Sequence, residues 1–145
     1  FYASLNKTLS STTDLKTLLS VVSHLIARTL KAEHVSLVVL PRAFRYISVG
    51  TESYRKLSRQ DAEIVGERLR GSALLSDLDD VPLRRLMQSY RLSLVLPIYK
   101  DGAVMGLLCF GEHKNSDYTK RDIRVLETIT DELSIAIQNA LSIQE

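Results

Sequence analysis

The sequence has one cysteine, few glycines and prolines, and no long apolar run, and these scarcities exclude several classes of protein. With Cys109 alone, neither an internal disulfide nor a cysteine-based zinc site can form. No run of 18 apolar residues occurs, so we expect no membrane-spanning segment and no membrane contact. Phe1 is not an initiator methionine and opens no signal peptide, so we expect an excised cytoplasmic domain, whose parent can be membrane-anchored.

The sequence also lacks an excess of charge of one sign. Its 19 basic and 17 acidic residues give a net charge of +2. Basic residues cluster twice, each time beside acids: the clusters are Arg84, Arg85 and Arg91, and Lys114, Lys120, Arg121 and Arg124. Proteins that bind nucleic acids gather basic residues into one dominant patch, with aromatic side chains for base stacking. We therefore predict no nucleic-acid binding.

What is present is the composition of an ordinary globular domain, with 45% hydrophobic and 25% charged residues. A chain of 145 residues fits one domain and can bury a core without disulfides. We predict a single domain over 1–145, with 1–12 as the end of an upstream linker helix and 135–145 as the start of a downstream signalling helix. Residues 10–13, all serine or threonine, are expected to interrupt the first helix.

Two apolar segments in the second half of the chain are the clearest strands. Segments 92–99 and 104–111 flank Asp101-Gly102, a dipeptide typical of tight hairpin turns. Both segments are apolar at nearly every position, whereas a half-exposed strand alternates between polar and apolar residues. We therefore expect the sheet to be covered on both faces.

The remaining elements follow from periodicity and capping residues. Strands are predicted at 35–40, 44–49 and 73–75, and helices at 13–30, at 58–69 up to a Gly71 cap, from Pro82, and from Thr119 to the end. This order predicts an α+β fold with a central antiparallel sheet of five to six strands. The N- and C-terminal helices are expected on one face, and short helices and loops on the other.

The last helix has more apolar surface than one sheet contact requires. One apolar line follows heptad spacing, and a second line consists of Val125, Ile129, Ala136 and Ile143. Either a wide stripe lies on the chain's own sheet, or the second line packs against a symmetry mate in a helical bundle. We favour the second interpretation, a homodimer through the terminal helices, in which segment 13–30 is the other helix.

No constellation of catalytic or metal-binding residues is evident. The histidines His24, His34 and His113 lie in different elements without a zinc-site spacing, and we expect them at the surface or at sheet edges. No phosphate loop or nucleophile elbow occurs. The acids in 77–80 lack the layout of a calcium loop. We therefore predict no catalytic residue and no metal site, and a chain that is not itself an enzyme.

Cys109 lies in the middle of an apolar strand, which offers a thiolate neither positive charge nor exposure. A core cysteine is the favoured interpretation. A redox-sensing, redox-catalytic or pocket-lining cysteine stays open as an alternative.

The predicted hairpin resembles the hallmark hairpin of GAF domains. Its parts are the proline-containing triplet Leu96-Pro97-Ile98, the Asp101-Gly102 turn, and Gly106-Leu107-Leu108. The last helix resembles that of the family at its start (Tyr118, Thr119 and Asp122) and near its end (Asn139-Ala140). Segment 32–37 resembles the stretch of the family in which the first strand starts. The resemblance covers nearly the whole chain.

This resemblance implies a non-catalytic sensory or regulatory module of a multidomain signalling protein, and we favour a sensor histidine kinase of a two-component system. GAF domains bind cyclic nucleotides, bilins, haem or other small molecules and pass signals through their terminal helices to an output domain in cis. Cys109 is predicted in a strand, whereas the bilin-binding cysteine of the family lies in a loop or helix, so covalent bilin binding is not expected. The Asn-Lys-x-Phe-Asp pattern of cyclic-nucleotide binders is absent. Methionine sulfoxide reductases of this fold need several cysteines, and this sequence has one. The cofactor stays unknown.

The family layout places a ligand pocket under segment 69–90. The candidate polar liners are Tyr46, Ser76, Asp77, Tyr90 and Ser93, although for each residue taken alone an ordinary surface or core role is the favoured interpretation. Three functions thus stay open: a small-molecule sensor, a ligand-free dimerisation module and, least favoured, a cysteine-dependent redox enzyme.

Overall fold

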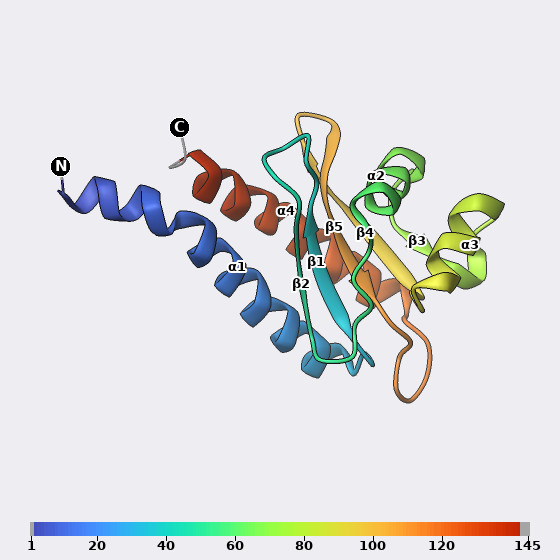
Figure 1. The fold of residues 1–145 in the computed structure, drawn as a ribbon. Helices are drawn as coiled ribbons and strands as arrows, with labels where there is room; N and C mark the ends of the chain where they lie inside the picture. Colours follow the sequence, from blue (N-terminus) through green and yellow to red (C-terminus); the bar gives the residue numbers. More distant parts are fainter. Residues whose placement is uncertain (1, 143–145) are drawn as a thin grey trace.

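A five-stranded antiparallel sheet forms the centre of the fold (Figure 1). The computed structural model describes residues 2–142, with side chains from residue 13 onward. The sheet order is β2-β1-β5-β4-β3, and every neighbouring pair is antiparallel. The strands are β1 (Val35–Val39), β2 (Ile47–Gly50), β3 (Ala73–Leu74), β4 (Leu94–Lys100) and β5 (Ala103–Phe110).

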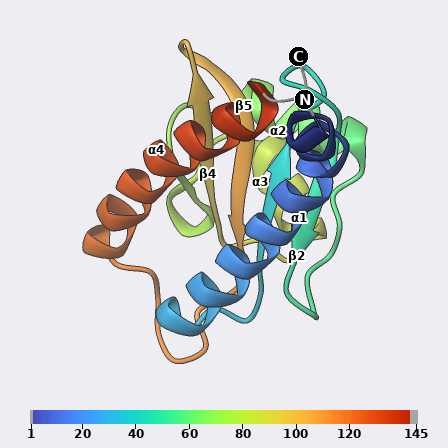
Figure 2. The same cartoon turned by 90° about the vertical axis from the view of Figure 1, so that its left-hand side faces the viewer.

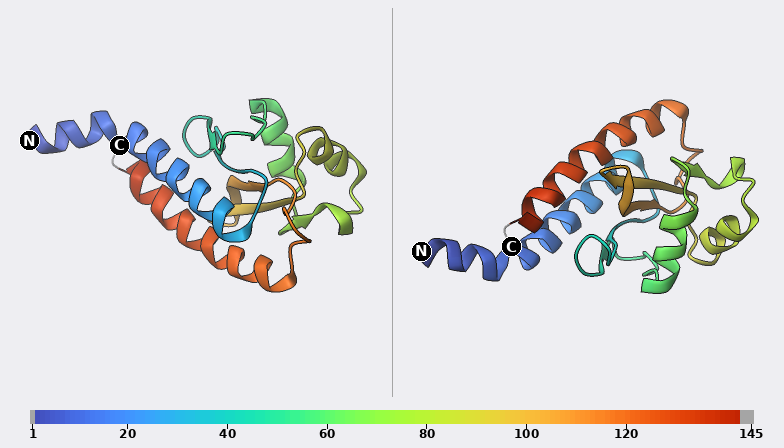
Figure 3. Two further views of the ribbon diagram at one scale, coloured as in Figure 1. Left: turned by 90° about the horizontal axis from the view of Figure 1, so that it is seen from below. Right: turned by 90° about the horizontal axis from the view of Figure 1, so that it is seen from above.

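Helices cover both faces of this sheet, which confirms the predicted α+β fold. The long helices α1 (Tyr2–Leu30) and α4 (Lys120–Ser142) form one layer, side by side and antiparallel (Figure 2). The start of α1 and the end of α4 lie at the same end of the molecule (Figure 3). The other face carries α2 (Arg59–Arg68), α3 (Val81–Ser89) and the 3₁₀ turn η1 (Leu75–Asp77).

Each face of the sheet has its own hydrophobic core, because successive side chains of a strand point to opposite faces. Towards α1 and α4, the buried residues include Leu37, Leu96, Leu108 and Phe110 of the sheet with Leu19 and Ile137 of the helices. Towards α2 and α3, they include Val38, Val95, Leu107 and Cys109 with Val65, Leu83 and Met87. Two covered faces explain why β4 and β5 are apolar at nearly every position.

Three local signals have the expected geometry. Asp101 and Gly102 have φ angles of 52° and 79°, as a tight primed turn requires. The N-terminus of α4 has a reciprocal capping box, in which the Thr119 Oγ1 accepts from the Asp122 amide at 3.0 Å and the Asp122 carboxylate accepts from the Thr119 amide at 2.9 Å. Ser58 caps α2 by accepting from the Asp61 amide at 3.0 Å.

Three other local expectations are wrong. Helix α1 continues through residues 10–13, because four serine or threonine residues cost about 2 kcal/mol in helix propensity, whereas nucleating a new helix costs about 4 kcal/mol. The second strand begins at Ile47 rather than at residue 44, since a turn occupies 41–43 and a bend 44–45. Gly71 has a φ of 86° but does not cap α2, which ends at an extended Leu69. Among residues 2–142, no helix has both the length and the apolar content needed to cross a bilayer.

Candidate functional site

The sheet face under α2 and α3, where the sequence predicts a ligand pocket, has an apolar interior with two tyrosines at its border. The Tyr46 hydroxyl donates to the Leu57 carbonyl at 2.5 Å, and burial raises the pKa of Tyr46 to about 12. The Tyr90 hydroxyl donates to the Asp61 carboxylate at 2.6 Å. Both tyrosines pack against the α2–α3 core. The Tyr90 hydroxyl joins the end of α3 to α2, and the Tyr46 hydroxyl joins the segment before β2 to the segment before α2.

The structure places the other three candidate liners nearer the sheet edge. Ser76 and Ser93 line one cavity together, and Asp77 lines a neighbouring cavity. The five candidates therefore fall into two groups, the tyrosines on the apolar core and the remaining residues around the start of β4 and the turn η1. A ligand role for any of them stays a prediction.

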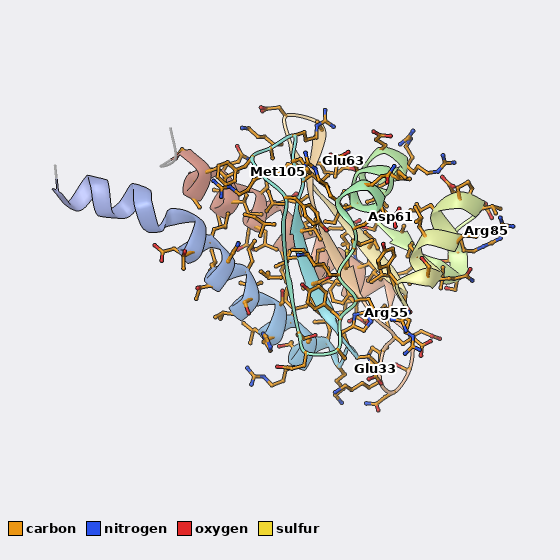
Figure 4. All side chains as sticks on the ribbon, viewed as in Figure 1. Glu33, Arg55, Asp61, Glu63, Arg85 and Met105 are labelled. Carbon is orange, nitrogen blue, oxygen red and sulfur yellow. The ribbon has the colours of Figure 1, made fainter. Side chains whose placement is uncertain are left out.

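A cleft of about 640 Å³ opens where β1 and β4 begin and β5 ends. We call it the polar cleft and define it by the lining residues Glu33, His34, Arg55, Arg91, Ser93 and Glu112. Figure 4 shows Glu33 and Arg55 near one another at this end of the sheet. Among the five residues that the sequence predicts as liners, only Ser93 belongs to this set.

Backbone hydrogen bonds fix the floor of the polar cleft. The Gly111 amide donates to the His34 carbonyl, and the Glu33 amide to the Glu112 carbonyl, both at 2.8 Å. Arg91 follows α3 with a φ of 55°, and the Leu92 amide donates to the Met87 carbonyl at 2.8 Å. This is a Schellman cap with arginine at the position that glycine usually occupies.

His34 is buried rather than at the surface, contrary to the sequence-based expectation, and it is 5% exposed. Its imidazole lies so close to Gly111 that a Cβ there would overlap the ring. Nδ1 of His34 has no hydrogen-bond partner, and no other buried side-chain nitrogen or oxygen among residues 13–142 shares this state. Burial is the main cause that lowers the pKa of His34, so the ring is neutral at pH 7.

The charges around His34 come from three separate parts of the chain. Arg55 and Arg91 also lower its pKa, whereas a hydrogen bond to the Arg91 backbone and the charge of Glu33 oppose the shift. Arg55 donates to the Ser89 carbonyl at 3.2 Å and so joins the loop after β2 to the end of α3. No local pattern marks these residues, because they meet only through tertiary contacts between segments that lie far apart in the chain.

We expect His34 to make stability depend on pH. Because its pKa is lower in the folded state than in the unfolded chain, its contribution is complete above the unfolded pKa of about 6.5 and declines as the pH falls below it. Urea unfolding at pH 8 and pH 5 should therefore show a smaller loss of stability in His34→Gln than in the wild type.

His24 provides the control with the opposite sign. Hydrogen bonds to the Ser20 carbonyl and to Glu52 raise its pKa, so its contribution is present below about pH 6.5 and is lost as the pH rises through the folded pKa. His24→Gln should lose at least as much stability on acidification as the wild type. Equal pH responses of His34→Gln and the wild type would contradict the assignment.

The predicted dimer residues of α4 differ in exposure. Val125 is 49% exposed, Ile129 is half-buried against the α1–α4 core, and Ala136 is also half-buried. Ile143 lies outside the described residues. The sequence pattern did not single out Ile135, which is 61% exposed. The predicted residues stay candidates for an interface.

Cys109 and the acidic residues do not form a recognisable reactive centre. The thiol is fully buried in β5, and burial raises its pKa to about 12, which the Ser36 hydroxyl opposes. In the part of the chain that the structure describes, no group of three or more histidine, cysteine, aspartate or glutamate side chains could hold a metal ion. The environment of Cys109 favours the interpretation as a core cysteine.

These features define an α+β domain with a two-helix layer on one side of the sheet and a shorter helical cover on the other. The family model of the GAF domain matches residues 12–138. The chain therefore belongs to the GAF family, a family of sensory and regulatory domains, and the resemblance found in its sequence is confirmed.

Solved structures share this fold at low sequence identity. The GAF domain of a phosphoenolpyruvate-protein phosphotransferase (ptsP) from Coxiella burnetii has a TM-score of 0.67 and 18% identity, covering 96% of this chain and 95% of that one. A phycoerythrobilin-bound GAF domain from a cyanobacterial phytochrome has a TM-score of 0.66 and 11% identity, with coverages of 98% and 96%. A GAF domain/HD domain protein from Geobacter sulfurreducens has a TM-score of 0.64 and 14% identity, with coverages of 92% and 97%. No curated protein matches the chain.

Proposed function

We propose that the chain is a non-catalytic regulatory domain that binds a small molecule and relays its signal through α1 and α4 in a homodimer. The output domain would follow in cis, and the parent that we propose is a sensor histidine kinase. The observation that carries the proposal is an exposed apolar stripe on α1, formed by Leu18, Val21 and Leu25. A helix that already buries one apolar face against its own sheet needs no second apolar face to stabilise the fold of the single chain.

The stripe is distinct from the buried face of α1. Leu15, Leu19 and Ile26 are buried, whereas Val21 is 60% and Leu25 is 52% exposed. Positions 18, 21 and 25 follow a three-four spacing and so share one side of the helix. This is the spacing with which paired helices bury their contact residues.

The candidate residues within the described part of α4, Val125, Ile129 and Ala136, lie on the flank that turns towards α1. Ser134 and Glu127 lie on the other flank, since Ser134 donates to the Tyr99 carbonyl of β4 and Glu127 accepts from Ser72 beside β3 at 2.8 Å. Val125 is two positions from Glu127 and therefore points to the opposite side of the helix. The α1 stripe and the Val125 flank can thus contribute to one apolar surface on the two-helix layer.

Charged substitutions in the stripe test this interface. In Val21→Glu/Leu25→Glu, two carboxylates per chain would have to be buried at the contact, so we expect a monomer of 16.3 kDa where the wild type has twice that mass. Light scattering over a dilution series measures the mass, and circular dichroism checks the fold.

The matched control is Ile64→Glu/Val81→Glu, which adds the same charges at two exposed aliphatic residues of α2 and α3, on the other face of the sheet. We expect this variant to stay dimeric. A monomeric wild type, or a dimer that survives the stripe substitutions, would contradict the proposed interface.

The second candidate function is a ligand-free dimerisation module. It is favoured by the filled interior beneath α2 and α3, where Leu83, Val65 and Met87 are fully buried. The two candidates share the helical relay and differ only in whether a small molecule biases it.

A further inference from the structure

We propose that the polar cleft binds a free α-amino acid as a zwitterion, with its carboxylate on Arg55 and Arg91 and its ammonium group on Nδ1 of His34 and the Glu33 and Glu112 carboxylates. This inference rests on the proposed function and deepens it, because it names the ligand class and moves the site from the α2–α3 interior to the end of the sheet. A volume of about 640 Å³ lies in the range of small-molecule sites.

The imidazole of His34, a residue that lines the cleft, has one nitrogen without a hydrogen-bond partner, Nδ1. A buried polar atom without a hydrogen bond is costly, and such atoms are rare in folded proteins. The ring is neutral at pH 7, and in the tautomer that carries its hydrogen on Nε2 the unpartnered Nδ1 has a lone pair that accepts a hydrogen. The missing partner of this tautomer is a donor, such as an N–H group of a ligand.

The charge of the cleft matches a ligand that carries both signs. The cleft is lined by two arginines and two glutamates around a neutral imidazole. Among the side chains that the structure describes, neither Arg55 nor Arg91 lies within ion-pair distance of an acid. A simple anion would leave the two glutamates without a partner, and a simple cation would leave the two arginines without one. A zwitterion provides a partner for the glutamates and for the arginines.

The backbone that carries the charged residues of the cleft is fixed before any ligand arrives. The cap that ends α3 fixes the backbone of Arg91, and the bond from the Glu33 amide to the Glu112 carbonyl joins the backbones of the two glutamates. The Arg55 side chain is itself positioned by its hydrogen bond to the Ser89 carbonyl. Groups that are positioned before binding lose less conformational freedom when they bind a ligand.

The test uses the whole chain and the twenty proteinogenic L-amino acids as probes, offered singly in a thermal-shift screen and then in calorimetric titrations. We expect at least one amino acid to bind. Its N-acetyl derivative and its methyl ester each lack one of the two charges, so each should bind at least about tenfold more weakly. On binding, the imidazole nitrogen resonances of His34 should shift, whereas those of His24 should not.

Two substitutions with the same backbone effect localise the site. Arg91 and Lys31 are both exposed basic residues with positive φ (55° and 56°) within two residues of a helix end, but only Arg91 lines the polar cleft. Arg91→Gly and Lys31→Gly each remove one positive charge and relieve the same backbone strain. We expect at least about tenfold weaker binding in Arg91→Gly and no change in Lys31→Gly.

The inference is overturned if none of the twenty amino acids binds, if the N-acetyl or ester form binds as tightly as the parent, or if Arg91→Gly binds like the wild type. The relay is tested separately by the mass of Val21→Glu/Leu25→Glu. A monomeric stripe variant of a dimeric wild type that binds no amino acid would leave the relay standing and remove only the ligand. Amino-acid binding by a wild-type monomer would leave the ligand standing and remove the dimeric relay.

Discussion

Gly106→Val is expected to lose about 3 kcal/mol or more of unfolding free energy, because the centre of the sheet has no room for a side chain there. A Cβ at Gly106 would lie 2.5 Å from the backbone carbonyl oxygen of Val38 on the neighbouring strand β1. Backbone cannot move aside as the end of a flexible side chain can. Urea unfolding followed by circular dichroism measures the loss.

The control for Gly106 is Gly102→Ala in the hairpin turn. Gly102 has a φ of 79° and nothing within 4 Å of an added Cβ, so only backbone strain opposes alanine there. We expect a loss of about 1 kcal/mol. Gly106→Val with a loss no larger than that of Gly102→Ala would show that β1 and β5 can separate at little cost, against the packing described here.

The close approach of β1 gives a physical reason for the glycine in the GAF-like hairpin. Gly106 pairs with Val39 on one side and Ile98 on the other, next to an irregularity in the β4–β5 register at Ile98 and Tyr99. Glycine within a strand commonly marks such a site, where another backbone approaches closely. Gly106 is therefore explained by the close packing of strands in the sheet and not by a phosphate-binding loop.

Cys109 is expected to react with a thiol reagent at least about a thousandfold more slowly in the native protein than in urea. Burial raises the pKa of the thiol from 9.0 to about 12, and the thiolate is the reactive species, so three pKa units reduce its population by about this factor. Exclusion of the reagent from the α2–α3 core slows the reaction further. Absorbance after adding an aromatic disulfide measures both rates.

The matched control for Cys109 places the same chemistry at the surface. Ser76→Cys in a Cys109→Ala background puts one thiol on an exposed turn, and we expect it to react at a similar rate with and without urea. A fast native reaction of Cys109 would contradict its burial and would favour the redox interpretation over the regulatory one. A slow reaction of Cys109 in the native protein and a fast reaction in urea would support a core cysteine.

The two proposals together describe a short route between ligand and relay. The polar cleft lies at the start of β1, and Lys31 and Ala32 lie between the end of α1 and the cleft residues Glu33 and His34. A ligand that binds these two residues thus acts a few positions from the helix that carries the apolar stripe. Such a ligand changes the relay only if it binds one arrangement of the helices better than another.

The sequence by itself determined the features that depend on neighbouring residues. The Asp101-Gly102 turn, the Ser58 and Thr119 caps and the doubly covered strands were all predictable, because turn chemistry, capping and periodicity act within a few positions of the chain. The local signal misled where a longer-range effect prevailed, as in the uninterrupted α1.

Only the tertiary structure decided which side chains meet. The sequence predicted His34 at the surface or at a sheet edge, whereas in the fold its ring is buried against Gly111 with an orphaned Nδ1. Arg55 and Arg91 join it from two distant segments. Helical spacing showed that α4 has surplus apolar residues but could not tell that Ile129 packs on its own core while Val125 and the α1 stripe stay exposed. The physical reason is that periodicity fixes the face of an element, whereas burial depends on the neighbour that the folded chain places against that face.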